Sequence, residues 1–363
     1  MLDATILKSE EKAVFALRSL YRQYGYLPYK MSKFEDYEYY IRNKDFLVSD
    51  RIITFNDTTG KLLALKPDVT LSIIKNGEDT PGCKQKVCYN ENVYRVSENT
   101  GRFKEIMQAG LECIGDIDLY DIFETLSLAA QSLGLISPEF VLQISHLGIL
   151  SAVLDRVCKD PGFRQKAMGF IAGKNTHDLT RLCREYGAEA TPLVQLISAY
   201  GPRSQVLGML EDLCPGEAAL EELKNLSALL DTLPASGQII FDFSLVNNMN
   251  YYNGIVLRGY LSGISESVLE GGQYDKLMQK LERRSGAIGF ALYLDLLEQL
   301  PVQRRQCDVD VLLVYEAGTP ARAVAQAVAQ LTAAGETVTA QKSIPQKLRY
   351  RRLVKLTKEG TLC

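Results

Sequence analysis

A carboxylate and an amide lie inside an otherwise apolar segment of this chain. The segment "EIMQAGLECIG" contains Gln108 and Glu112 among residues suited to a protein core. If it forms a strand, the spacing of four places both side chains on one face, because alternate residues of a strand share a face. Such groups are either paired structural residues or the lining of a pocket for a small polar ligand.

Three more segments place polar groups at the start of a helix or the end of a strand. "LKPDVT" has Asp68 and Thr70 near a predicted helix N-terminus, and "NNMNYYNG" has Tyr251 and Tyr252. "EGGQYD" has Tyr274 after a glycine pair, which lets another group approach the backbone closely. Each segment alone is explained by a helix start, a turn or packing. The four together favour a pocket.

The elements that would hold these residues follow from hydrophobic spacing. Apolar residues at helical intervals predict a helix from about Ser9 to Tyr24. The segment 51–76 predicts a strand, a turn, a second strand and a helix starting near Pro67. "KVCYNENVYRV" and "EIMQAGLECIG" predict two strands, followed by a helix at about Leu119 to Leu133 and the strand "EFVLQISH".

The pattern changes near Leu147, where a series of short amphipathic helices begins and continues to about Leu233. Strands then resume around the tyrosine-bearing turn, and "SGAIGFALYLDLLEQL" predicts a strand that runs into an apolar helix. We therefore divide the chain into a first core part at 1–146, a helical insertion at 147–234 and a second core part at 235–300. Residues 301–363 form a truncated α/β appendage with one βαβ unit, which we expect to dock on the main body.

Composition narrows the classes of function. The net charge of the 363 residues is -3, so no global basic field points to nucleic acid. No apolar run is long enough to span a bilayer, and the N-terminus does not resemble a secretory signal, so we expect a cytoplasmic protein without membrane contact. His146 and His177 are the only histidines. With eight irregularly spaced cysteines they predict neither a metal site nor a histidine-dependent nucleophile, and we expect no cofactor.

The four segments together resemble the histidyl-tRNA synthetase family, which has a class II synthetase fold. "LKPDVT" is similar to its Leu-Arg-Pro-Glu-Gly-Thr motif, and "VYRVSENTGRFKEIMQAGLECIG" resembles its motif 2. "LVNNMNYYNG", "GGQYDKL" and "AIGFALYLDLLEQL" are similar to three further motifs, the last being motif 3. The resemblance extends from about Ser9 to Leu300. It implies an α+β fold with an antiparallel sheet flanked by helices.

The resemblance also implies a histidine pocket. Asp68 and Gln108 would bind the α-amino group, and Glu112 and Tyr252 would bind the imidazole, with Thr70, Tyr251 and Tyr274 nearby. This chemistry is reasonable in itself. Neutral imidazole offers one donor and one acceptor, which a carboxylate and a phenol can satisfy, and a carboxylate facing an ammonium forms a charge-assisted hydrogen bond.

The positions that match the family's catalytic groups differ. The catalytic arginine is replaced by Asn247, the ATP-binding arginine of motif 3 by Leu296, and the motif 2 glutamate by Ser97. Asparagine carries no charge to stabilise an adenylate-forming transition state. Arg95 and Arg102 remain as candidate contacts for an anion or nucleotide. We therefore predict a pocket without catalytic residues.

A synthetase-like chain that keeps the histidine pocket but loses the chemistry resembles the regulatory-subunit family of ATP phosphoribosyltransferase. This implies a non-catalytic, histidine-sensing subunit that is required by a short-form catalytic subunit, in a hetero-oligomer containing a homodimer of this chain. The alternatives are a divergent histidyl-tRNA synthetase that activates histidine with ATP, and a separate RNA-binding protein. The basic segment "QKLRYRRLVKLTK" favours a solvated edge over tRNA binding.

Overall fold

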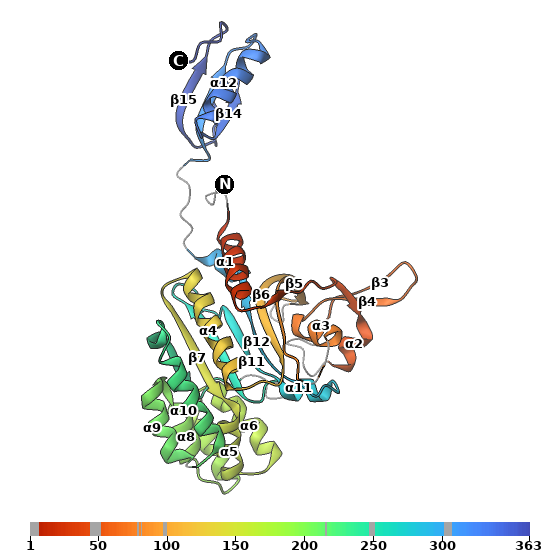
Figure 1. The fold of residues 1–363 in the computed structure, drawn as a ribbon, viewed down its shortest axis with the longest axis vertical. Coiled ribbons are helices and arrows are strands. Elements are labelled where there is room, and N and C mark those ends of the chain that lie inside the picture. The colour runs from red at the N-terminus through yellow and green to blue at the C-terminus, as the bar shows by residue number, and fades with distance from the viewer. Residues whose placement is uncertain are drawn as a thin grey trace. The chain divides into compact units, whose positions relative to one another are not determined.

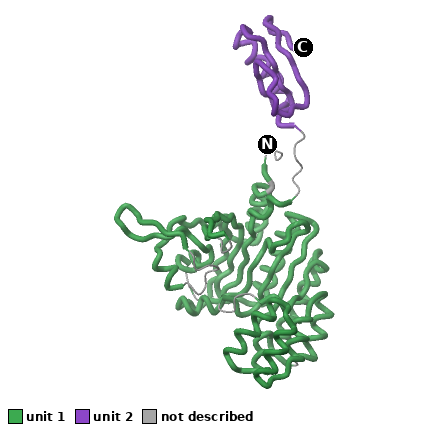
Figure 2. The backbone as a smooth tube through the Cα atoms, turned by 180° about the vertical axis from the view of Figure 1, so that it is seen from behind, with its two compact units in different colours: residues 1–300 green, residues 301–363 purple. Residues whose placement is uncertain are grey.

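The structure is a computed structural model that describes residues 7–43, 52–77, 80, 82–96, 100–214, 216–246, 251–300 and 307–363. The chain divides into two compact units, Met1–Leu300 and Pro301–Cys363 (Figure 2). Each unit is described separately below.

A nine-stranded sheet forms the centre of the larger unit (Figure 1). Its inner strands pair antiparallel, whereas β1 pairs with β5 and β7 pairs with β9 in parallel. The α+β fold with a mainly antiparallel sheet is thus confirmed. The strands in spatial order are β1 (Leu27–Pro28), β5 (Gln85–Val96), β6 (Phe103–Gly115), β12 (Gly286–Tyr293), β11 (Leu269–Gln273), β10 (Ile255–Leu261), β7 (Phe140–His146), β9 (Ile239–Asp242) and β8 (Tyr200–Pro202).

Two long helices, α1 (Ser9–Gln23) and α4 (Leu119–Ile136), cover one face of this sheet (Figure 1). Leu111 of β6 and Phe290 of β12 point toward that face, where the ring of Tyr21 packs on Phe290 with centroids 6.1 Å apart. Residues next to Leu111 and Phe290 in sequence therefore point to the opposite face, because side chains alternate along a strand. Gln108 and Glu112 belong to that opposite face.

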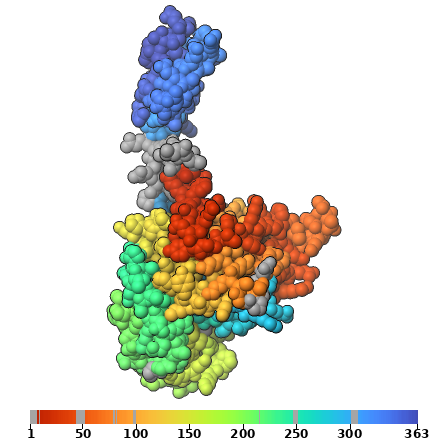
Figure 3. Space-filling model, in the orientation of Figure 1, coloured from red at the N-terminus to blue at the C-terminus, as the bar shows by residue number. Residues whose placement is uncertain are grey.

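Six α-helices between β7 and β9 form one side of the larger unit, coloured yellow-green to green in Figure 3. Phe163, Leu210 and Leu226 of these helices are fully buried in the same hydrophobic cluster as Leu142 of β7. The helical segment therefore shares the core of the sheet. Its helices are α5 (Leu147–Val157), α6 (Pro161–Ala172), α7 (Thr176–Glu185), α8 (Thr191–Ser198), α9 (Arg203–Leu213) and α10 (Ala218–Leu230).

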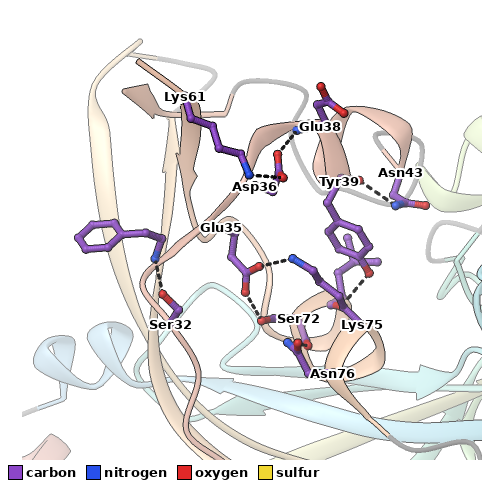
Figure 4. A network of polar contacts seen from close by, with 12 residues as sticks. Ser32, Glu35, Asp36, Glu38, Tyr39, Asn43, Lys61, Ser72, Lys75 and Asn76 are labelled. Atoms are coloured by element: carbon purple, nitrogen blue, oxygen red, sulfur yellow. Dashed lines mark hydrogen bonds and ion pairs between the residues drawn. The ribbon is translucent and has the colours of Figure 1, made fainter. Parts of the chain in front are cut away.

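A small three-stranded antiparallel sheet lies beside helix α3 (Val69–Asn76). Its strands are β2 (Phe34–Asp36), β4 (Leu62–Leu65) and β3 (Thr54–Asn56), and α2 (Tyr37–Arg42) follows β2. The buried carboxylate of Glu35 accepts hydrogen bonds from Ser72 Oγ at 2.6 Å and Lys75 Nζ at 2.8 Å (Figure 4). The hydroxyl of Tyr39 donates to the carbonyl oxygen of Leu71 at 3.0 Å. These bonds fix α3, whose N-terminus begins beside Asp68.

The smaller unit is a three-stranded parallel sheet in the order β14-β13-β15 with one helix, α12 (Ala321–Ala333). The predicted βαβ unit is present as β13 (Val309–Tyr315), α12 and β14 (Val338–Gln341). The basic segment forms the edge strand β15 (Tyr350–Leu356). There Arg351 and Arg352 are exposed and pair with acidic residues.

The last elements of the larger unit are α11 (Asp275–Lys280) and η4 (Leu294–Gln299). The apolar helix predicted after β12 is this η4 segment, which is a 3-10 helix. No helix within the described ranges is long and apolar enough to cross a membrane. The same ranges contain no cluster of three or more residues that could ligate a metal ion.

Candidate functional site

The register of the four central strands builds the floor of a cavity. Glu112 on β6 lies opposite Gly289 on β12, which lies opposite Gly272 on β11. Two residues further along, the row across the same strands reads Gly110, Ala291 and Glu270, and then Arg258 on β10. Small residues on the middle strands leave room above this face of the sheet, and the resulting cavity has a volume of about 400 Å³.

Two glycines are required for this floor. A Cβ at Gly289 would lie only 2.6 Å from Cδ of Glu112 and would also overlap the carbonyl oxygen of Leu111. A Cβ at Gly110 would lie 2.5 Å from the hydroxyl oxygen of Tyr89. Both distances are below van der Waals contact, so the absence of a side chain lets Glu112 and Tyr89 lie flat over neighbouring strands.

The structure brings all the predicted histidine-pocket residues together around this cavity. They come from the start of α3, from β6, from the segment before β10 and from the end of β11. The residues are Asp68, Thr70, Gln108, Glu112, Tyr251, Tyr252 and Tyr274. Arg95 also lines the cavity, whereas Arg102 is exposed in the connection between β5 and β6 and does not line it.

Glu112 is the most enclosed acidic group of the site, with 2% of its surface exposed. Thr70 Oγ1 donates to its Oε1 at 2.7 Å, and the hydroxyl of Tyr274 donates to its Oε2 at 2.7 Å. Burial raises the pKa of Glu112 to about 8, although the two hydroxyl donors act to lower that pKa. The carboxyl group therefore holds a proton at neutral pH until a ligand provides a positive partner.

Asp68 caps helix α3 by accepting the backbone N–H of Leu71 at 2.8 Å. Burial raises the pKa of Asp68, while the Arg95 guanidinium and the backbone N–H groups of Leu71 and Thr70 act to lower it. Arg95 Nη2 lies 3.9 Å from Asp68 Oδ2. Asp68 thus joins the helix N-terminus to the cavity.

Three tyrosines form one wall of the cavity. The ring centroids of Tyr251 and Tyr252 are 4.6 Å apart, and those of Tyr251 and Tyr274 are 5.8 Å apart. Burial raises the pKa of all three hydroxyls well above the ordinary value, so they remain neutral. Neutral phenols can donate and accept hydrogen bonds, which suits a heteroaromatic ligand.

Several lining residues were not predicted. Arg258 and Glu270 are direct cross-strand partners, with Arg258 Nε 3.0 Å from Glu270 Oε1. Tyr89 and Tyr293 also line the cavity. One signal could have indicated Glu270, since it directly precedes the glycine pair of "EGG". Arg258 and Tyr293 enter the cavity through strand register, which the sequence does not give.

The positions matching catalytic residues are only partly described. Asn247 and Ser97 lie outside the described residues. Leu296, at the motif 3 arginine position, is on η4 and packs against the large hydrophobic cluster. The side chain at this position thus contributes to the core.

Comparisons with known proteins identify relatives of this chain. The family model described as histidyl-tRNA synthetase matches residues 4–297. An ATP phosphoribosyltransferase regulatory subunit from Oceanobacillus iheyensis is 28% identical over 312 residues, covering 83% of this chain and 76% of that relative.

Solved structures are similar in fold. A structure titled ATP phosphoribosyltransferase regulatory subunit/histidyl-tRNA synthetase, from Bacillus halodurans, superposes with a TM-score of 0.77 at 23% identity. It covers 98% of this chain and 97% of that chain. A chain of the ATP phosphoribosyl transferase (HisG:HisZ) complex from Thermotoga maritima gives a TM-score of 0.64 at 20% identity, covering 78% of this chain and 97% of that chain.

The fold and the family match define the class: the chain belongs to the histidyl-tRNA synthetase family. Within this family it is of the ATP phosphoribosyltransferase regulatory-subunit type, which is regulatory and not catalytic. The predicted resemblance to that type is confirmed.

Proposed function

We propose that this chain binds free histidine in the cavity and makes an ATP phosphoribosyltransferase sensitive to that amino acid. Its partner would be a short-form catalytic subunit that performs the first step of histidine biosynthesis in the cytoplasm and needs this chain for activity. A homodimer of this chain would form part of the hetero-oligomer. The observation that carries the proposal is the buried Glu112 carboxyl, held by Thr70 and Tyr274 and facing a cavity of amino-acid size.

The roles of the residues follow from their chemistry. Glu112 would bind one imidazole nitrogen and Tyr252 the other, so that donor and acceptor are both satisfied. Asp68 and Gln108 would bind the α-ammonium, for which Asp68 supplies a charge-assisted hydrogen bond. Arg102, exposed outside the cavity, would have no role in this site.

Regulation requires that histidine bind two arrangements of the hetero-oligomer with different affinities. A coupling free energy of about 1–3 kcal/mol is the usual scale and is enough for feedback inhibition. The cavity is walled by Tyr89, Tyr251 and Tyr274, which belong to the hydrophobic cluster that also contains Leu71 and Ile73 of α3. A bound ligand could therefore shift α3 and the small sheet packed on it.

The test is co-purification with a short-form catalytic subunit, followed by an assay of its activity with and without histidine. The unmodified chain should activate the partner, and histidine should inhibit the pair. Glu112→Gln should abolish the inhibition but leave assembly intact, because a neutral amide can neither give a proton to the imidazole nor carry the negative charge that would pair with it.

The matched control is Glu105→Gln on the same strand, where the carboxylate is exposed and bonded to Asn92 and Tyr94. This variant should stay histidine-sensitive. Full histidine sensitivity of the Glu112 variant would contradict the proposed pocket, and histidine-dependent ATP–pyrophosphate exchange by the chain alone would contradict the regulatory function.

A further inference from the structure

The position of the Tyr252 hydroxyl depends on the backbone that carries it. Tyr252 lies in the short segment before β10, outside any helix or strand. The proposed function places one nitrogen of the imidazole against this hydroxyl. A hydrogen bond weakens steeply when its distance or angle changes, so the segment must be held in one place. The hydrogen bonds of the segment show how it is held.

Gln273, the last residue of β11, holds this segment from below. Its Oε1 accepts the backbone N–H of Ile255 at 2.6 Å, and its carbonyl oxygen accepts the N–H of Asn253 at 3.1 Å. Gln273 is buried, with 9% of its surface exposed. Within the described part of the chain it does not line the cavity. Gln273 therefore bonds the residues on both sides of Gly254 from a position outside the cavity.

The segment also packs closely on β11. A Cβ at Gly254 would lie 2.7 Å from Cδ of Gln273, so the amide lies directly against this backbone. A Cβ at Gly272 would lie 2.8 Å from Cδ1 of Tyr252, so the tyrosine ring packs on the neighbouring residue of β11. Both distances are shorter than van der Waals contact. Adjacent residues of β11 thus fix the ring and the backbone of the same segment.

Further hydrogen bonds connect the segment to two helices. Asn253 Nδ2 donates to Asp275 Oδ2 at 3.0 Å, and Asp275 Oδ1 accepts the backbone N–H of Ala287 on β12 at 2.9 Å. The carbonyl oxygen of Gly254 accepts the N–H of Leu147, the first residue of α5, at 2.9 Å. The segment is therefore bonded to β11, to the start of α11 and to the start of α5.

We propose that Gln273 is a positioning residue for histidine, because it holds the segment so that the Tyr252 hydroxyl meets the imidazole. This inference rests on the proposed function and adds the residue on which selectivity for an imidazole ligand depends. Ile255 is fully buried, and a buried N–H without an acceptor is costly. A side chain without the amide would therefore favour movement of the segment. Its effect on histidine should pass through the Tyr252 hydroxyl.

The experiment is a double-mutant cycle between Gln273→Met and Tyr252→Phe, with histidine affinity measured by calorimetric titration of the full chain. Methionine is unbranched and of similar length, but its thioether is only a weak acceptor. Gln273→Met should weaken histidine binding by about tenfold in the protein that keeps Tyr252, and by less than about threefold in Tyr252→Phe. A purely structural role would give the same factor in both backgrounds.

Three further variants support the cycle. Gln279→Met makes the same exchange at an exposed position of α11 and should leave histidine affinity unchanged. Asn253→Ala removes the bond to Asp275 and should weaken histidine binding by about threefold, again only when the Tyr252 hydroxyl is present. Should Gln273→Met not fold, Gln273→Asn takes its place with the same expectation, because its amide is one methylene too short to reach Ile255.

Two results would overturn this inference while leaving histidine binding intact. They are an equal loss of affinity from the substitution at Gln273 with and without the Tyr252 hydroxyl, and normal affinity in Gln273→Met. Normal affinity in Tyr252→Phe would also overturn it, since the hydroxyl would then not bind the ligand. If the unmodified protein bound no histidine, the proposed function itself would fail, and this inference with it.

Discussion

Charged side chains in the cavity of the larger unit differ in burial and in hydrogen bonding from those on the edge strand of the smaller unit. In the cavity, Glu112 and Asp68 are 2% and 8% exposed, and each has specific hydroxyl or N–H donors. On β15, Arg352 pairs with Glu336, but 48% of its side chain remains exposed. The cavity contains few charged groups, and burial strongly changes the energy of their charged forms. The edge strand carries many charged groups, and because they are exposed to water their energies change little.

This difference in burial indicates which charged groups are informative about function. In water-exposed pairs the Coulomb energy is largely offset by solvation and side-chain entropy, so such pairs contribute about 0–1 kcal/mol. A buried carboxyl such as Glu112 has a shifted pKa and costs stability unless it has partners. Shifted and enclosed groups are typical of binding sites. The basic character of β15 therefore says less about ligands than one carboxyl on β6.

The largest effect should come from filling the cavity floor. Gly289→Ala should abolish histidine binding and destabilise the fold by about 1–3 kcal/mol, because the added Cβ overlaps Glu112 and the backbone of β6. Gly208→Ala is the control: it lies in helix α9 with open space around its Cβ position, and alanine favours helix there. Calorimetry and chemical denaturation measure both effects. Normal histidine affinity in Gly289→Ala would show that the ligand does not use this floor.

The next largest effect is expected in the pH dependence of histidine affinity. Free imidazole has a pKa of about 6.5, and the pKa of Glu112 is about 8. Between these values the imidazole is neutral and Glu112 carries a proton, which it can donate to one imidazole nitrogen while the other nitrogen donates to Tyr252. Below about pH 6.5 a proton must be released on binding, and above about pH 8 Glu112 loses the proton that makes it the donor, so affinity should fall by up to about tenfold per pH unit on either side.

The same pKa affects stability of the ligand-free chain. The folded pKa of Glu112 is raised from the ordinary 4.5, so the protonated carboxyl stabilises the fold at low pH. This contribution should decrease as pH rises from about 4.5 through about 8. Glu112→Gln should remove both the alkaline decrease in histidine affinity and this slope of the unfolding free energy. A flat affinity profile from pH 6.5 to 9 in the unmodified chain would contradict the assignment.

An intermediate effect is expected at the support of α3. Glu35→Gln should lower the free energy of unfolding by about 1–3 kcal/mol, because Lys75 loses its buried charged partner and Ser72 loses a carboxylate acceptor. Histidine affinity should fall several-fold, since α3 carries Asp68 and Thr70. Glu38→Gln is the control, because its pair with Arg42 is exposed. Chemical denaturation and histidine titration of both variants measure whether the position of α3 affects the unfolding free energy and the histidine affinity.

The smallest effect is expected on the smaller unit. Arg352→Gln should change the unfolding free energy of this unit by no more than about 1 kcal/mol and leave histidine affinity unchanged. A loss of several kcal/mol, or a change in histidine response, would show that this surface does more than an exposed ion pair does.

Much of the larger unit could be predicted from the sequence, because its strands and helices have clear periodicity. The spacing of Gln108 and Glu112 predicts one shared face, and both side chains do line the cavity. Arg258 and Tyr293 could not be predicted, since their places depend on which strands pair and in which register. The short strands β1 and β2 and helix α2 gave no pattern of their own, because two to six residues contain too little periodicity.

The most direct test of the central claim is calorimetric titration of histidine into the full chain, alone and with a short-form catalytic subunit. The account predicts saturable binding at one site per chain in the unmodified protein, and at least about tenfold weaker binding in Glu112→Gln. No saturable heat with histidine in either preparation, or equal binding by the Glu112 variant, would contradict it.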